Sequence, residues 1–242
     1  MAESVHLASF AKQNSNVLGP PRHSALVRIT HWIQTLSFLA LVVSGVAILL
    51  AHPRLYWGET GGVGGPSLID LPLPFVLTGQ SGWGRSLHFL AGWVCVLNGI
   101  LYVVAGLVTQ HFRQDLLPSN ADFAWSNITR EVSNHLRWKR PGAEEFYSYN
   151  VLQRLTYLAV VFLLSPLIIL TGLAMSPAIT SVFPVLVTTF GGQQSARTIH
   201  FFVASLLVLF VLVHVAMVCA AGFTSRMRGM ITGHGAVRKE PL

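Results

Sequence analysis

Four histidines lie in or at the edge of long apolar stretches, where imidazole is an unusual side chain: His31, His88, His200 and His214. Because ionisable groups are costly in hydrocarbon, such a histidine is by default a candidate functional residue. His200 and His214 share one apolar stretch, residues 197–221, and stand fourteen positions apart. In an α-helix that spacing is about four turns, which places both imidazoles on one face and about 21 Å apart along the axis. One helix would therefore present nitrogen ligands at two levels, which suggests two stacked metal centres.

Apolar stretches long enough to cross a bilayer, about 20 residues each, occur four times in the chain. The 242 residues are 52% hydrophobic and only 10% charged, a balance typical of a multi-span membrane protein and not of a soluble domain. We predict an all-α, integral membrane four-helix bundle, with residues 25–225 as its core domain, residues 1–24 as an N-terminal segment and residues 226–242 as a basic tail. The predicted helices cover residues 26–50, 87–108, 151–175 and 199–221.

The distribution of positive charge predicts the orientation of the bundle. Thirteen of the sixteen lysines and arginines fall in the terminal segments and around the 109–154 connection, whereas the opposite side has only Arg54, Arg85 and Arg197. By the positive-inside rule both termini are then cytoplasmic. The net charge of +7 is therefore interpreted as a topology signal, and nucleic-acid binding is a poor explanation of it. We expect no removable signal peptide, because the first apolar stretch is too long for one.

With this orientation the histidines fall into two pairs by depth. The first helix runs outward, so His31 lies near the cytoplasmic face, while the second and fourth helices run inward. His88 and His200 then lie near the outer face, and His214 lies near the inner face at the level of His31. Two bis-histidine haems on three helices would need this arrangement. The alternative for each histidine is a purely structural role, in which its ring is hydrogen-bonded to a neighbouring helix. This explanation would have to hold for all four histidines.

An arginine precedes three of the four histidines by three residues: Arg28, Arg85 and Arg197. At that spacing the guanidinium lies on the face of the histidine, one turn nearer the membrane surface. Haem propionates are anionic, and a guanidinium can bind a carboxylate bidentately. His214 lacks such a partner, and Arg28 or Arg154 could serve its haem instead. The alternative is an arginine that reaches to the membrane surface from a helix end.

The remaining histidines and the cysteines point to no further cofactor. Only two cysteines are present, Cys95 and Cys219, both inside apolar runs, and there is no C-x-x-C-H sequence. An iron–sulfur cluster, a structural zinc site and covalent c-type haem are therefore not expected. His23 and His111, with Asp115, could relay protons to a quinone or could be ordinary interfacial side chains. Four histidines lie in tails or beside loops and have no expected role: His6, His52, His135 and His234.

Several local patterns complete the expected architecture. The 52–86 connection is long and rich in glycine and proline, and long ordered loops tend to be functional. Residues 122–137 could form an interfacial helix, and Pro166 is expected to kink the third span. The sequence Leu170-Thr171-Gly172 echoes Val43-Ser44-Gly45, a similarity too short to establish a repeat. Gly92, Gly99 and Gly106 recur every seven residues, which allows either close helix packing or clearance for a flat macrocycle.

Taken together, the motifs Arg28-Ile-Thr-His31-Trp32, Arg85-x-x-His88 and Arg197-x-x-His200, with His214 fourteen residues further on, resemble the bacterial di-haem cytochrome b superfamily. This group includes cytochrome b-561, the cytochrome b subunit of nickel–iron hydrogenases, and the gamma subunits of formate dehydrogenase and thiosulfate reductase. The resemblance covers residues 22–225. The chain is also similar, more weakly, to cytochromes that accompany molybdopterin enzymes of the sulfite-oxidase type.

The resemblance implies that the four histidines ligate two haems b, one near each face of the bacterial inner membrane. It also implies electron transfer in a respiratory chain between a periplasmic redox enzyme, of hydrogenase or molybdopterin type, and the quinone pool. The quinone would bind near His31 and His214, and the 52–86 loop would dock the partner. Two other classes of function stay open. One is a stand-alone cytochrome b-561 that passes electrons from a small outer donor such as superoxide to quinone, and the other is a non-haem transporter or structural bundle.

Overall fold

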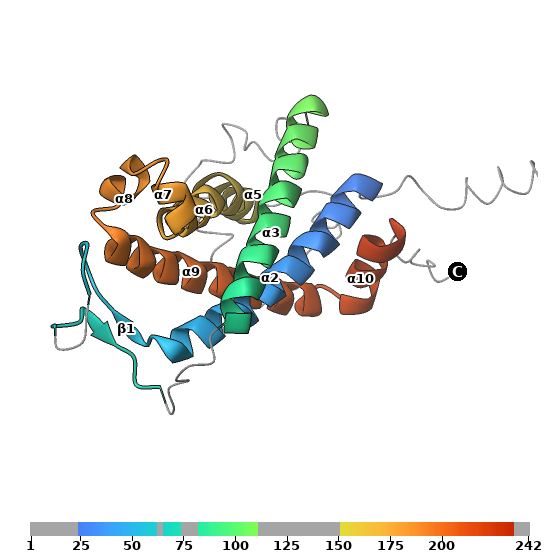
Figure 1. Cartoon of the computed structure of the whole chain (residues 1–242). Helices are drawn as coiled ribbons and strands as arrows, with labels where there is room; N and C mark the ends of the chain where they lie inside the picture. The colour runs from blue at the N-terminus through green and yellow to red at the C-terminus, as the bar shows by residue number, and fades with distance from the viewer. Residues whose placement is uncertain (1–23, 62–64, 74–81, 111–150, 235–242) are drawn as a thin grey trace, which may run out of the picture.

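The structure, a computed structural model, describes residues 24–61, 65–73, 82–110 and 151–234 (Figure 1). In these residues four helical spans are long and apolar enough to cross a membrane. Three are single helices: α2 (Ala25–Ala51), α3 (Gly82–Val108) and α9 (Gln193–Ala220). The fourth consists of α5 (Val151–Ala159), the π-helical segment η3 (Val160–Leu164) and α6 (Ser165–Ala174). The predicted all-α membrane fold with four spans is confirmed.

The spans pack as two neighbouring pairs, α2 against α3 and α6 against α9. Figure 1 shows α2 and α3 side by side, with α9 running across them from α8 at one end to α10 at the other. Both α3 and α9 begin earlier than predicted, at Gly82 and Gln193, so that Arg85 and Arg197 lie inside helices one turn before a histidine.

Small and hydroxyl-bearing residues fill the interior, and large apolar residues lie on the surface. The largest fully buried side chains in the described residues are Leu55, Thr171, Thr198, Ser44 and Ser195. Leucines such as Leu36, Leu97 and Leu212 are more than 60% exposed. This is the reverse of a soluble protein. It fits helices that approach closely through small residues and face lipid with their leucines.

The third span widens where Pro166 interrupts its hydrogen bonding. Proline has no amide hydrogen to donate, and its ring clashes with the carbonyl four residues earlier. The chain accommodates it with the π-helical turn η3, in which both the backbone N–H and the hydroxyl of Ser165 donate to the carbonyl of Val160, the hydroxyl at 2.7 Å. The sequence predicted a kink at Pro166, and the structure has a π-turn in the residues just before it.

A short helix that the sequence had not indicated, α10 (Phe223–Thr232), follows α9 and runs from the end of the predicted core domain into the predicted basic tail. Two side chains of α2 hold its carboxyl end, where helix carbonyls lack intrahelical partners. Arg28 Nη1 donates to the carbonyl of Ile231 at 2.7 Å, and Trp32 Nε1 donates to that of Met230 at 3.2 Å. The chain after the last span is thereby tied to the first.

The connection between α2 and α3 contains a two-stranded antiparallel hairpin, β1 (Arg54–Leu55) paired with β2 (Ile69–Asp70). Arg54 Nε and Asp70 Oδ2 form an ion pair at 3.1 Å, and the Asp70 carboxylate raises the pKa of Arg54. The other connection carries two short helices, α7 (Pro177–Thr180) and α8 (Val185–Thr189). The predicted interfacial helix 122–137 lies outside the described residues, as do several polar candidates: His6, His23, His111, Asp115 and His135.

Candidate metal centres

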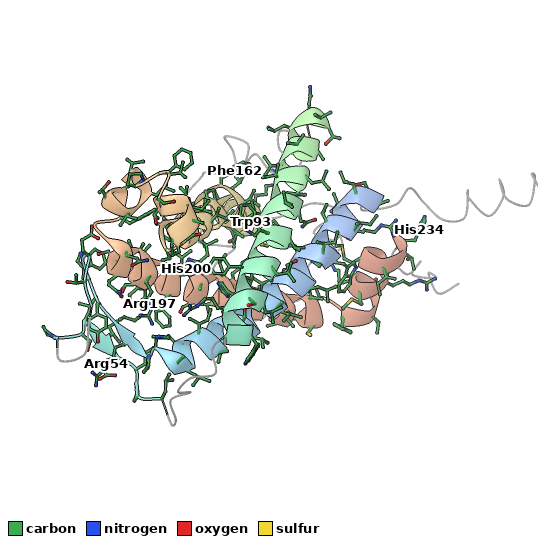
Figure 2. All side chains as sticks on the ribbon, in the orientation of Figure 1. Arg54, Trp93, Phe162, Arg197, His200 and His234 are labelled. Atoms are coloured by element: carbon green, nitrogen blue, oxygen red, sulfur yellow. The ribbon has the colours of Figure 1, made fainter. Side chains whose placement is uncertain are left out.

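Both predicted histidine pairs are brought together across helices. His88, in the second turn of α3, lies opposite His200, in the third turn of α9, with ring centroids 6.2 Å apart and ring planes at 60°. His31 of α2 lies opposite His214 of α9, with ring centroids 6.4 Å apart and planes at 51°. Figure 2 shows His200 near the middle of the molecule, with Arg197 closer to the hairpin that carries Arg54. The pairing deduced from depth in the membrane is therefore the pairing in space.

The ring separations fit two imidazoles that share one metal ion. A metal–nitrogen bond is about 2.0–2.1 Å and the imidazole centroid lies roughly 1.1 Å beyond the nitrogen, so two rings on one ion have centroids about 6.3 Å apart. Both observed separations, 6.2 and 6.4 Å, lie within 0.1 Å of this value. The centroid separation of each pair is therefore compatible with one iron atom bound to both rings.

Within the described residues, each pair offers two imidazoles as metal ligands. The described residues contain no group of three or more His, Cys, Asp and Glu side chains that could hold a metal ion. A structural zinc site takes four protein ligands, so these pairs do not resemble one. Two axial nitrogens suit an iron whose other four ligands come from a porphyrin.

Hydroxyl groups from neighbouring helices contact both rings of the His88–His200 pair. Ser44 Oγ of α2 lies 3.0 Å from His88 Nδ1, and Thr171 Oγ1 of α6 lies 3.0 Å from His200 Nδ1. A glycine follows each of them and leaves room for the ring. A Cβ on Gly45 would lie 3.7 Å from His88 Cε1, and one on Gly172 would lie 3.4 Å from His200 Cε1. Sequence reasoning noted the Ser-Gly and Thr-Gly echo but assigned it no role.

Aromatic rings, in contrast, flank the His31–His214 pair. Phe210 stacks on His214 at 5.9 Å, and the edge of Trp32 meets His31 at 5.5 Å. Among the described residues, no hydrogen-bond partner reaches the buried Nδ1 of His31. The two pairs therefore share a ring separation but differ in what holds their rings.

The surroundings of two glycines of α3 favour clearance for a flat macrocycle over close packing between helices. A Cβ on Gly92 or Gly99 would have nothing within 4 Å of it. At about 100° per residue, both glycines lie within roughly 40° of the direction of His88, on the face that meets α9. Gly106 is buried, as a packing glycine would be. The open space at Gly92 and Gly99 is of the kind that a flat macrocycle would fill.

A family model described as prokaryotic cytochrome b561 matches residues 22–233. The chain belongs to this family. A relative named putative protein-methionine-sulfoxide reductase subunit YedZ1, from Azospira oryzae, is 31% identical over 212 residues, which are 88% of this chain and 96% of its own length. No solved structure shows a significant match.

Two further relatives are named probable Ni/Fe-hydrogenase B-type cytochrome subunit. They come from Azotobacter vinelandii and Azotobacter chroococcum and are 24% and 23% identical over 225 residues, 89% of this chain and 87% of theirs. The resemblance to a cytochrome b superfamily is thereby confirmed. This chain is a membrane cytochrome of b type, and its family implies haem b as the cofactor.

The arginines of this cytochrome b561 occupy varied environments. Arg197 is half-buried and donates from Nη2 to the main-chain carbonyl of His52. Arg28 binds α10, as described above. Arg85 is exposed at the start of α3, and Arg154 is half-buried in α5. A guanidinium has five N–H donors, so these contacts leave donors for a second partner at Arg28 and Arg197. Their role in holding propionates stays a prediction.

The hairpin connection is fixed onto the amino-terminal end of α9, close to His200. The carbonyl of Gly58 accepts from the N–H groups of Gln194 and Ser195 at 3.0 and 3.3 Å, and Ser195 Oγ accepts from Gly58 N at 2.7 Å. Thr198 Oγ1 donates to the carbonyl of Tyr56 at 2.6 Å. These bonds use the donors that a helix leaves unpaired at its start. The cytochrome thus has an ordered connecting segment beside one of its two candidate metal centres.

A polar cluster between α2 and α3 was not predicted from the sequence. Asn98, which is 6% exposed, donates from Nδ2 to the carbonyl of Thr30 at 2.9 Å and to Gln34 Oε1 at 3.0 Å. Gln34 Nε2 lies 2.8 Å from Cys95 Sγ. Buried amides that pair across membrane helices stabilise their association. The signal in the sequence was the presence of Gln34 and Asn98 in apolar runs.

Proposed function

We propose that this cytochrome holds two haems b and passes electrons across the bacterial inner membrane between a periplasmic redox enzyme and the quinone pool. The observation that carries the proposal is the presence of two imidazole pairs, each at the separation of axial ligands on one iron, at opposite ends of α9. His88 and His200 would hold the outer haem, and His31 and His214 the inner one. A haem held by two imidazoles would supply an electron-transfer centre, and the two histidines of each pair would occupy the positions that oxygen would need to bind.

The span of the two sites supports a transmembrane path. His200 and His214 are about 21 Å apart along the axis of α9, in a hydrocarbon layer of about 30 Å. Each centre therefore lies near one face of the membrane, and the two together bridge most of its thickness. The charge distribution of the sequence, with 13 of 16 basic residues on one side, supports cytoplasmic termini and an outer position for His88 and His200.

The ordered hairpin supports a partner on the outer side. The Tyr56–Gly58 segment, which follows β1, is hydrogen-bonded to α9 within two turns before His200, so a protein seated on it would lie close to the outer haem. Trp57 is 60% exposed within this segment and offers the kind of aromatic anchor that interfaces favour. The relatives named as subunits of a reductase and of a hydrogenase support a redox enzyme as that partner.

The direction of electron flow follows from the partner. The 31% identical relative is named as a reductase subunit, which favours electrons moving outward from quinol to a periplasmic reductase. A quinol oxidised near the inner haem yields two electrons, taken up one at a time, and two protons released to water. We place that quinone site beside His31 and His214, on the face predicted to be cytoplasmic.

A dithionite-reduced minus oxidised spectrum of the purified protein, with a pyridine haemochrome assay, tests the proposal. We expect two haems b per chain. His88→Ala or His200→Ala should halve the haem content, His31→Ala or His214→Ala should remove the other haem, and one change from each pair should remove both. A matched control is His52→Ala, whose exposed side chain is in neither pair. One haem per chain, or a haem content unchanged by these substitutions, would overturn the assignment.

A further inference from the structure

The two rings of the outer pair are held by the same device on two different helices. On α2, Ser44 precedes Gly45, and on α6, Thr171 precedes Gly172. In each case the hydroxyl oxygen lies 3.0 Å from the Nδ1 atom of the opposite histidine, and the glycine faces Cε1 of the same ring. Both hydroxyl residues are fully buried, with an exposed fraction of 0%. The short echo in the sequence thus corresponds to a repeated contact in space.

The direction of these hydrogen bonds can be worked out from the contacts of the hydroxyls. Ser44 Oγ lies 2.7 Å from the carbonyl oxygen of Ala40, and Thr171 Oγ1 lies 2.8 Å from that of Leu167. Two oxygens at that distance need a hydrogen between them, and a hydroxyl has only one. Each hydroxyl hydrogen is therefore committed to its own helix, and toward the histidine the oxygen can only accept.

It follows that Nδ1 of both histidines carries the proton. A neutral imidazole has one N–H and one lone pair, so Nε2 of His88 and of His200 is left as the free ligand atom. The hydroxyls also stop each ring from rotating about its Cβ–Cγ bond. Both effects would be in place before a metal arrives, because every hydrogen-bond partner involved belongs to the chain.

We propose that Ser44 and Thr171 are positioning residues of the outer centre, which accept from His88 and His200, fix the tautomer that exposes Nε2, and strengthen both rings as iron ligands. This inference rests on the proposed role of His88 and His200 as ligands of the outer haem. Acceptors at the second nitrogen of a ligating histidine raise its basicity. A more basic ligand favours ferric over ferrous iron, so the two bonds lower the midpoint potential of the outer haem. No such acceptor reaches His31 Nδ1 within the described residues.

The test compares Thr171→Val with Thr171→Ser in the full-length, haem-loaded protein. Valine keeps the shape of threonine but has no hydroxyl, whereas serine keeps the hydroxyl. We expect the valine variant to raise the midpoint potential of the outer haem and leave that of the inner haem unchanged, and the serine variant to restore it. If the preference of the haem for the ferric over the ferrous state falls threefold, its midpoint potential rises by about 28 mV. The conversion is 59 mV for each tenfold change in that preference, for a one-electron couple.

Ser44→Ala probes the other ring independently and should shift the same haem in the same direction. The g values of the low-spin ferric signal depend on the relative orientation of the two imidazole planes, so they report ring rotation that a general loss of stability would not change. Ser37→Ala is the matched control, because Ser37 is buried in α2 and donates to its own helix at 2.8 Å without a histidine contact.

The outcomes separate this inference from the proposed function. Two haems with an unchanged outer potential and unchanged g values in Ser44→Ala combined with Thr171→Val would overturn the positioning role alone. Selective loss of the outer haem in Thr171→Val supports the role if Thr171→Ser restores it, and contradicts the role if it does not. A wild-type protein without two haems, or haem unaffected by His88→Ala and His200→Ala, would overturn the proposed function and with it this inference.

Discussion

Substitutions at Gly92 and Gly99 of α3 test whether a cofactor fills the open space beside these glycines. Neither has an atom within 4 Å of the position a Cβ would take. Gly92 lies one turn below His88 and Gly99 about 16 Å below it, so the two glycines face different centres. We predict that Gly92→Leu reduces the outer haem by half or more, and that Gly99→Leu does the same to the inner haem. Haem-to-protein ratio and the α-band spectrum of each purified variant measure this.

Leu97→Phe is the matched control for these changes. Leu97 lies on the same helix and is 62% exposed, on the surface that lipid covers. A larger side chain there should leave both haems in place. If the two glycine variants also keep a full complement of haem, the open space on α3 holds lipid or nothing, and clearance for a macrocycle is the wrong explanation of the glycines.

The four histidines could be predicted from the sequence because their helical spacing and depth depend only on local geometry. Ser44 and Thr171 could not be assigned a role in the same way. A serine or threonine in a membrane helix satisfies its hydroxyl by donating to its own helix, as Ser37 does. Nothing in the residue type shows whether the oxygen also accepts from a ring on another helix, and that contact depends on how α2 meets α3 and how α6 meets α9.

At the level of elements, the joint between the hairpin and α9 depends on Gly192. Its φ of +115° and ψ of 164° belong to a backbone region that only glycine adopts easily. A Cβ there would also collide with the main chain of Gly58. We predict that Gly192→Ala destabilises the protein by about 1–3 kcal/mol. At about 2–4 °C per kcal/mol for a chain of this size, the Tm of the haem-loaded protein should fall by several degrees.

The loss of helical circular dichroism on heating measures that change. Gly82→Ala is the control, since Gly82 begins α3, has no positive φ and has no atom near its Cβ position. Equal melting of the Gly192→Ala variant and the wild type would show that the hairpin joint contributes nothing to stability. It would also remove the structural basis for an ordered docking surface beside the outer centre.

The boundaries of α3 and α9 illustrate what the sequence leaves undetermined at this scale. Both helices begin with polar or small residues, Gly82-Trp83-Gly84 and Gln193-Gln194-Ser195, which resemble a loop when read alone. They are helical because tertiary contacts support them. Gly84 packs against Ala47, and the first amides of α9 are bound by the carbonyl of Gly58. The hairpin and α10 were missed for the same reason, because their stabilising contacts come from residues far away in the chain.

For the whole molecule, the charge bias predicts a topology that fusion reporters can measure. We expect a fluorescent protein fused after Leu242 to fluoresce, because the charge bias predicts a cytoplasmic C-terminus. We expect alkaline phosphatase inserted at residues 62–64 to be active, because the same bias predicts that this connection is periplasmic. The physical reason is the excess of basic residues in the segments that would stay inside, 13 against 3.

The opposite pattern of reporter activity would show that the protein has the reverse orientation in the membrane. The centre of His88 and His200 would then face the cytoplasm, and a periplasmic partner on the hairpin would be ruled out. Charge-neutralised variants provide the control. Exchanging Arg226 and Arg228 for glutamine should weaken the bias without altering either histidine pair, because both residues lie beyond α9, in α10.

Both histidine pairs draw one member from α9, the last of the four spans, and their other members from α2 and α3. During synthesis the first three spans therefore enter the membrane with neither site complete. His31 and His88 therefore have no partner until the fourth span has been made. Cofactor loading at either candidate centre would follow the synthesis of α9, and a chain released before α9 would contain neither histidine pair. The placement of His200 and His214 on one helix thus couples the completion of both candidate centres to a single step of membrane insertion.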